Sequence, residues 1–367
     1  MKRHTTLIAM LLLTVIAATA QVKTGIDVLC DNGFEPLQGK RVGLVTNPTG
    51  VNRDLVSTVD LIANAPGVTL AALYAPEHGV RGNVTAGAKV ATYTDTQTGV
   101  KVWSIYGATT KPTAAMLAGI DVMVYDIQDI GSRSYTFIST MGKCMEACAE
   151  NGIPFIVLDR PNPLGGEKVE GCLVDSDCVS FVSQYPVPYV YGLTCGELAR
   201  YLNGEGLLRR GVRCDLPVIP MQGWRRGMLW QDTGLEWVMT SPHVPQPVSA
   251  LFYPASGILG ELDYMSIGVG YNLPFQLFCA SWADAAKLAD TLNSMDIKGF
   301  RFRPIHIRPY YGLGTGRDLQ GVQPYITDYD ACELTLLQFH VMEAVARLWP
   351  AHKPFASATA ARLAMFD

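Results

Sequence analysis

Short apolar runs alternate with stretches of helical periodicity through the first half of the chain. The runs are almost continuously apolar, which is typical of strands buried on both faces of a sheet. Strands are predicted over residues 41–46, 68–74, 121–125 and 153–158. Helices are predicted between them, over 54–65, 112–118 and 135–151. This alternation predicts an α/β fold with a doubly wound, mostly parallel sheet that helices cover on both faces.

The pattern continues beyond a loop rich in Pro and Gly and changes near Val248. Residues 89–107 alternate around a Thr98-Gly99 turn and predict an inserted hairpin. The later predicted elements are a helix at 195–202, a strand at 212–219, helices at 281–295 and 334–349, and strands at 300–308 and 321–327. We therefore expect the large α/β domain to span 21–245 and a smaller α+β accessory domain to span 246–367.

The first twenty residues have the features of a secretory signal peptide. A basic start at Lys2 and Arg3 precedes an apolar run over 7–17, which closes on Ala18-Thr19-Ala20. The run is too short for a spanning helix and ends in small residues. We expect cleavage after Ala20, no membrane anchor and a periplasmic location.

Composition narrows the possible functions. The 367 residues are 49% hydrophobic, enough for a large core, and the formal charge of −4 makes a nucleic-acid partner unexpected. The nine cysteines show no Cys-x-x-Cys spacing, and the six histidines show no metal-binding spacing. No G-x-G-x-x-G follows the first predicted strand, and P-loop and G-x-S-x-G motifs are absent. We expect neither a nucleotide cofactor nor any other.

Polar residues directly follow each of the four predicted strands. The carboxyl ends of parallel strands meet at one edge of the sheet, where loops and helix N-termini form a ligand crevice. The side chains brought there, strand by strand, are Asn47; Glu77, His78 and Arg81; Asp126, Gln128 and Asp129; and Asp159, Arg160 and Asn162. One such residue alone is more often a turn former or helix cap. Together they indicate a binding site.

Two kinds of chemistry fit the acidic residues of this crevice. Paired carboxylates catalyse glycoside hydrolysis, in which one protonates the leaving oxygen and the other acts as base or nucleophile. Asp126, Asp129 and Asp159 could instead hold a divalent cation, because hard cations prefer carboxylate ligands. Glu77 stands apart because Glu is a poor turn former and because Pro76 and Gly79 restrict its loop.

Ser132 and Arg133 open the helix predicted at 135–151. Backbone N–H groups at a helix N-terminus, together with a guanidinium group, suit a carboxylate or phosphate ligand. Ordinary capping by Ser132 or Ser134 is the alternative.

Four of these segments resemble the exo-β-N-acetylmuramidases, a family first described as a domain of unknown function. The likeness runs from about Gly25 to the C-terminus, and its specific motifs are Val42-Gly43-Leu44-Val45-Thr46-Asn47, Ala75-Pro76-Glu77-His78-Gly79-Val80-Arg81-Gly82, Tyr125-Asp126-Ile127-Gln128-Asp129-Ile130-Gly131-Ser132-Arg133 and Leu158-Asp159-Arg160-Pro161-Asn162-Pro163-Leu164-Gly165-Gly166. The C-terminal half departs from the family pattern at Tyr191-Gly192-Leu193-Thr194, Gly260-Glu261-Leu262-Asp263 and 323–328. We expect these positions to line the accessory side of the cleft.

The resemblance implies a Rossmann-like domain, an accessory domain and an active site in the cleft between them. It also implies release of terminal N-acetylmuramic acid from the non-reducing ends of peptidoglycan fragments, in cell-wall recycling, with Glu77 catalytic. We expect Glu77 to be the general acid, Asp126 or Asp159 to be the second carboxylate, and Arg133, with Arg160 in reserve, to bind the lactyl carboxylate. The alternatives are a non-catalytic protein that binds peptidoglycan fragments or another sugar, and a metal-dependent hydrolase.

Overall fold

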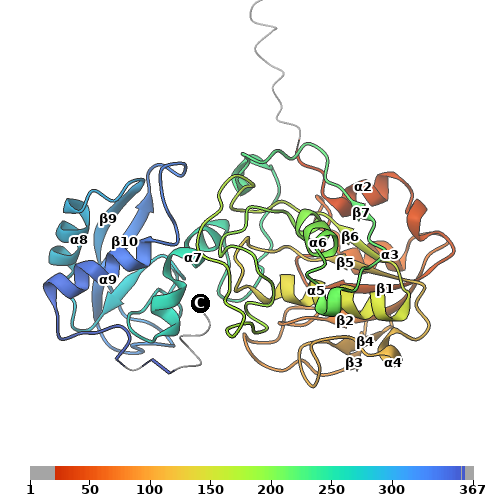
Figure 1. The fold of residues 1–367 in the computed structure, drawn as a ribbon, viewed down its shortest axis with the longest axis horizontal. Coiled ribbons are helices and arrows are strands. Elements are labelled where there is room, and N and C mark those ends of the chain that lie inside the picture. The colour runs from red at the N-terminus through yellow and green to blue at the C-terminus, as the bar shows by residue number, and fades with distance from the viewer. Residues whose placement is uncertain (1–20, 357, 360–367) are drawn as a thin grey trace, which may run out of the picture.

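The protein consists of two parts joined by a long helix. The computed structural model describes residues 21–356, 358 and 359, so the predicted signal peptide lies outside the described residues. Figure 1 shows the larger part built on one sheet, the smaller part built on another, and helix α7 (Pro247–Glu261) between them. Within the described residues, no helix combines the length and the apolar character needed to cross a bilayer.

The larger part contains a seven-stranded sheet in the order β3-β4-β2-β1-β5-β6-β7. Neighbouring strands are parallel, except that β3 is antiparallel to β4. The strands are β1 Arg41–Thr46, β2 Thr69–Ala75, β3 Tyr93–Thr94, β4 Lys101–Ser104, β5 Val122–Asp126, β6 Phe155–Leu158 and β7 Val218–Ile219. Without β3, the strands follow the Rossmann order, which reverses direction between β1 and β5. The predicted fold class is confirmed.

Helices cover both faces of this sheet. Successive side chains of a strand point to opposite faces, so Leu44 and Val45 of β1 enter two separate apolar cores. The helices α2 (Gly25–Asp31) and α3 (Thr58–Ala63) supply the core that contains Leu44. The core that contains Val45 is supplied by α4 Ala114–Leu117, α5 Thr136–Asn151 and α6 Cys195–Gly204.

The smaller part is an antiparallel sheet packed against helices. Its strand order is β8-β10-β9, and β9 and β10 form a long hairpin. The elements are β8 Phe278–Ala280, α8 Ala285–Ser294, β9 Phe300–Ile307, β10 Leu319–Ile326 and α9 Leu337–Leu348. Phe252, Ala255 and Leu259 of α7 belong to the same continuous core as buried residues of α5 and α9. Side chains of helix α7 therefore join the two parts through one continuous apolar core.

Two of the differences between the predicted and the observed secondary structure involve proline. Helix α7 is absent from the prediction. In the structure Pro247 occupies its first turn, where no N–H is needed, and Pro254 is accommodated inside the helix. The strand predicted over 212–219 is reduced to Val218–Ile219. Pro217 has no N–H for a ladder, although its carbonyl accepts a hydrogen bond from Val157 N at 3.1 Å.

Candidate active site

The predicted polar side chains do meet at the carboxyl edge of the sheet, where they bind mainly one another. Asp126, at the end of β5, is fully buried. Arg160 donates to both of its carboxylate oxygens, from Nε at 2.5 Å and from Nη2 at 2.8 Å, and Thr58 Oγ1 donates at 2.5 Å. Arg160 Nη2 also reaches Val51 O at 2.8 Å. This buried ion pair joins four chain segments.

Asp159 has a similar structural position after β6. Its carboxylate accepts hydrogen bonds from Thr194 Oγ1 at 2.9 Å, Gly196 N at 2.8 Å and Arg160 N at 3.0 Å. It therefore binds the first turn of α6. A Cβ atom on Gly196 would lie 2.8 Å from the Asp159 carboxyl carbon, so this approach needs glycine. Burial raises the pKa of Asp159 to about 6.

Asp129 accepts hydrogen bonds from Tyr191 Oη and, at 2.8 Å, from Gly131 N. Burial raises the pKa of Asp129 to about 6, against the opposing effect of these hydrogen bonds. Gln128 Nε2 donates to Asp129 O at 2.8 Å and to Pro161 O at 2.7 Å. These groups fix the loop that leads from β5 into α5.

Asn47 and Asn162 stabilise turns at this edge of the sheet. Asn47 Oδ1 accepts from Thr49 N at 2.9 Å, and Asn162 Oδ1 accepts from Leu164 N at 2.9 Å. Ser132 is fully buried. Arg81 forms a bidentate pair with Asp95 at 2.9 and 3.0 Å.

The side chain of Arg133, which was expected to bind the substrate carboxylate, binds other parts of the protein instead. Its side chain is fully buried, and Nη1 donates to Cys172 O at 2.5 Å and to Val187 O at 2.9 Å, while Nε donates to Ser183 Oγ at 3.3 Å. The guanidinium also lies 5.5 Å from the Tyr189 ring centroid. Because its donors bind Cys172 O, Ser183 Oγ and Val187 O of one loop, the expectation that Arg133 binds a substrate carboxylate does not fit this geometry.

A cavity of about 500 Å³ lies between the two parts, beside this network. Its wall comes from the loops after β2 and β4, the start of α5, the segment 241–243, the end of α7 and loops of the smaller part. Of the residues predicted at the strand ends and at the start of α5, Glu77 and His78 line it, and the others do not. Of the positions expected on the accessory side of the cleft, Gly260, Glu261 and Asp263 line it, whereas Tyr191 and residues 323–328 do not. The predictions of Asp126 or Asp159 as second carboxylate, and of the remaining residues as substrate ligands, are therefore not supported by their positions.

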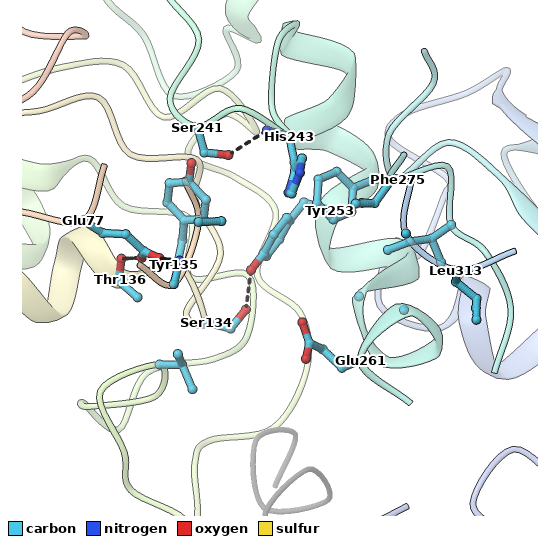
Figure 2. Close-up of a pocket in the computed structure, with 18 of the residues that line it drawn as sticks. Glu77, Ser134, Tyr135, Thr136, Ser241, His243, Tyr253, Glu261, Phe275 and Leu313 are labelled. Carbon is cyan, nitrogen blue, oxygen red and sulfur yellow. Dashed lines mark hydrogen bonds between the residues drawn. The ribbon is translucent and has the colours of Figure 1, made fainter. Parts of the chain in front are cut away.

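Glu77 projects into this cavity from the β2 loop, as Figure 2 shows. Its Oε2 accepts a hydrogen bond from Thr136 Oγ1 at 2.6 Å, and its Oε1 accepts from Gly87 N at 2.8 Å and from Tyr106 Oη at 3.1 Å. Burial, and then the nearby Glu77 charge, raise the pKa of Tyr106 to about 12, so its hydroxyl keeps its proton. Donors from three segments thus orient one half-buried carboxyl group.

Two histidines lie in the cavity wall. His78 Nδ1 is 3.1 Å from Val84 O, and its backbone has a φ of 69°. Asp263 and Phe275, which also line the cavity, have φ values of 52° and 68°. Backbone strain of this kind in residues other than glycine concentrates at functional sites. Burial, and then the proximity of His78, lower the pKa of His243, so this imidazole is neutral at pH 7.

Aromatic side chains form the apolar wall. The rings of Tyr135 and Tyr253 meet edge to face with centroids 5.6 Å apart, and Tyr253 lies 4.9 Å from Phe275. Ser134 Oγ is 2.8 Å from Tyr189 Oη and 3.4 Å from Tyr253 Oη. Figure 2 shows Ser134 and Tyr253 facing one another, which connects the start of α5 to α7.

The cavity is acidic. Glu261 and Asp263, from the end of α7 and the residues after it, line it together with Glu77. In Figure 2, Glu77 and Glu261 lie on different sides of the cavity. Among the described residues that line it there is no Lys or Arg.

Two models of one protein family match the chain. Residues 42–248 match the family described as "Exo-beta-N-acetylmuramidase NamZ, N-terminal", and residues 251–367 match its C-terminal counterpart. The chain belongs to the exo-β-N-acetylmuramidase NamZ family. The boundary between these two matches lies close to the expected division at 245.

Relatives of the NamZ family cover nearly the whole chain. The peptidoglycan β-N-acetylmuramidase NamZ of Bacillus subtilis (strain 168) is 43% identical over 341 residues, which are 93% of this chain and 81% of that protein. A crystal structure of a DUF1343 family protein from Bacteroides fragilis NCTC 9343 is 56% identical, with a TM-score of 0.89, and covers 95% of this chain and 88% of its own. Another from the same organism is 25% identical, with a TM-score of 0.70, covering 94% and 91%.

The sequence predicted some of the residues that line this cavity and gave no indication of others. Glu77 and His78 were identified from their loop, and Glu261 and Asp263 from their departure from the family pattern. The aromatic residues and His243 gave no local signal, because they reach the cavity from segments far apart in sequence. Among the described residues, no group of three or more His, Cys, Asp or Glu side chains is placed to hold a metal ion.

The pKa of Asp129 leads to a test of the buried network. Between pH 4 and 6 the folded protein holds a proton on Asp129 that the unfolded chain has released, so the free energy of unfolding falls as pH rises through this range. The Asp129→Asn variant has no ionisable group at this position, so its free energy of unfolding does not fall for this reason. Relative to the parent, the variant should gain about 3 kcal/mol between pH 4 and 7, from roughly two units at 1.36 kcal/mol each. Urea unfolding at several pH values measures this difference, and a constant difference would show that Asp129 ionises normally.

Proposed function

We propose that the protein is an exo-acting β-N-acetylmuramidase that releases terminal N-acetylmuramic acid from the non-reducing ends of peptidoglycan fragments. The observation that carries this proposal is the Glu77 carboxyl group, held by three hydrogen bonds in a cavity of small-ligand size. The relative from Bacillus subtilis, a peptidoglycan β-N-acetylmuramidase, has the same class of activity.

Glu77 acts as the general acid in this proposal. It donates its proton to the glycosidic oxygen while the bond from that oxygen to C1 of the muramic residue breaks, and the leaving sugar departs as an alcohol. Water then supplies the oxygen at C1 and returns a proton to the site. The aromatic wall of Tyr135, Tyr253 and Phe275 excludes solvent from the apolar parts of the sugar.

Glu261 is the second carboxylate in this proposal. It replaces Asp126 and Asp159, because it lines the cavity on a different side from Glu77 and their carboxylates are held by the buried network. It assists the step in which water or the substrate's own acetamido oxygen attacks C1.

Substitution of Glu77 should abolish turnover without unfolding the protein. Glu77→Gln keeps the shape and the acceptor oxygen but cannot donate the proton, so kcat for a muramic-acid-terminated disaccharide should fall by about 10²–10⁴. The measurement is the release of N-acetylmuramic acid, with an unchanged unfolding midpoint as the control for folding. Full activity in the variant would refute the assignment.

The same assay separates the alternative functions. A non-catalytic binding protein would bind the disaccharide and release no sugar. A metal-dependent hydrolase would lose turnover with a chelator and regain it with a divalent ion, whereas the proposed mechanism predicts equal rates with and without the chelator.

A matched pair of variants tests the second carboxylate. Glu261→Gln should lower kcat by about a hundredfold, because assistance of the attack is lost, while Asp263→Asn should change it by less than tenfold. Both residues line the cavity, so general damage to the wall would affect both variants alike. If kcat falls more in Asp263→Asn than in Glu261→Gln, the role belongs to Asp263. If both variants keep the kcat of the parent, no second carboxylate assists the attack on C1, and the assignment of Glu261 is wrong.

The reaction takes place, in this proposal, in the periplasm. Support comes from the basic and apolar pattern of residues 1–20 and the small residues before Gln21. The protein purified from a bacterial periplasmic fraction should begin at Gln21, as determined by N-terminal sequencing. Recovery in the cytoplasmic fraction with Met1 intact would contradict it.

A further inference from the structure

The hairpin loop between β9 and β10 presents two tyrosines to solvent. Tyr310 is 74% exposed and Tyr311 is 52% exposed, although these neighbouring rings carry a large apolar surface. Isolated exposed aromatic residues are ordinary, but an adjacent pair next to a cavity indicates a binding surface. We call these two residues the tyrosine rim.

Backbone hydrogen bonds brace the loop that carries the tyrosine rim. Gly270 O accepts from Tyr310 N at 2.8 Å and from Tyr311 N at 3.4 Å. Gly270 has a φ of 94°, and a Cβ atom there would lie 1.8 Å from Tyr311 O, so only glycine permits the contact. Arg308 and Asp318 close the base of the loop with a bidentate ion pair at 2.9 Å. The tyrosines are therefore positioned before any ligand binds.

Ring stacking joins the tyrosine rim to the cavity. The Tyr311 ring stacks on His243 with centroids 6.0 Å apart and an interplanar angle of 28°. Tyr310 stacks on Tyr271 at 5.7 Å and 19°. His243 is a wall residue, and Gly312 and Leu313, which directly follow the rim, also line the cavity. Figure 2 shows His243 and Leu313 in place there.

We infer that the tyrosine rim is a subsite for the sugar on the leaving-group side of the scissile bond. This inference rests on the proposed function: an exo-acting enzyme encloses the terminal sugar, so the rest of the fragment must lie outside the cavity. A β-linked pyranose has an apolar face of C–H groups, which packs against an aromatic ring. Because the rings are already held in place, binding costs little side-chain conformational entropy, and the affinity for the sugar is higher.

Two substrates that share the terminal sugar test the subsite. One is the N-acetylmuramic acid–N-acetylglucosamine disaccharide, and the other is the methyl β-glycoside of N-acetylmuramic acid, which has no second sugar. In the variant Tyr310→Ala/Tyr311→Ala, kcat/KM for the disaccharide should fall about tenfold, mainly through KM, while the methyl glycoside should be cleaved as by the parent. The variant Tyr310→Phe/Tyr311→Phe keeps both rings and should retain most of the activity.

Tyr201→Ala is the matched control, because Tyr201 is 41% exposed on α6 and does not line the cavity. It should leave kcat/KM unchanged for both substrates. An equal fall for both substrates in the Ala pair, at an unchanged unfolding midpoint, would overturn the subsite, because the rim would then serve the terminal sugar. No change for either substrate would overturn it as well.

Failure of the proposed function is a separate outcome. If the parent cleaves neither substrate, calorimetric titration with the disaccharide still decides the subsite. A dissociation constant about tenfold higher in the Ala pair than in the parent would support the rim as a sugar-binding surface, and equal constants would overturn it.

Discussion

The buried ion pair between Asp126 and Arg160 is the constraint on which the arrangement of the site depends. Both side chains are withdrawn from water, so each charge is stabilised mainly by the other and by hydrogen bonds from Thr58 and to Val51. Loss of one partner from such a pair leaves an uncompensated buried charge, which costs about 3–5 kcal/mol. The pair therefore fixes the loops after β1, β5 and β6 and the start of α3 in one position.

This constraint also explains where the cavity lies. In Rossmann-like sheets the ligand crevice is at the reversal of strand order, here between β1 and β5. That crevice is occupied by the ion pair and by the turns that surround it. The open space lies instead beside the loop after β2 and the start of α5. The fixed exit of β5 places α5, and Thr136 on its first turn holds Glu77 by a hydrogen bond of 2.6 Å.

Continuity of the apolar runs was enough to predict the parallel strands, because a strand buried on both faces has no polar positions. The same runs located the polar residues at one edge of the sheet. They could not show which of these groups bind one another, since Asp126 and Glu77 both follow a buried strand and differ only in their partners. The expectation that Arg133 binds substrate does not fit the structure for the same reason. Two of its acceptors, Cys172 O and Val187 O, belong to a loop that is distant in sequence.

Helix α7 connects the chemistry of the two parts. Its buried Phe252 and Leu259 pack into the core shared with α5, and Glu261 stands at its last turn. Apolar packing between the parts therefore helps to set the position of Glu261 relative to Glu77. Since packed cores resist deformation, the gap across which a sugar must fit is set by these apolar side chains. The cavity is thus a product of the whole fold, although Glu77 comes from a single loop.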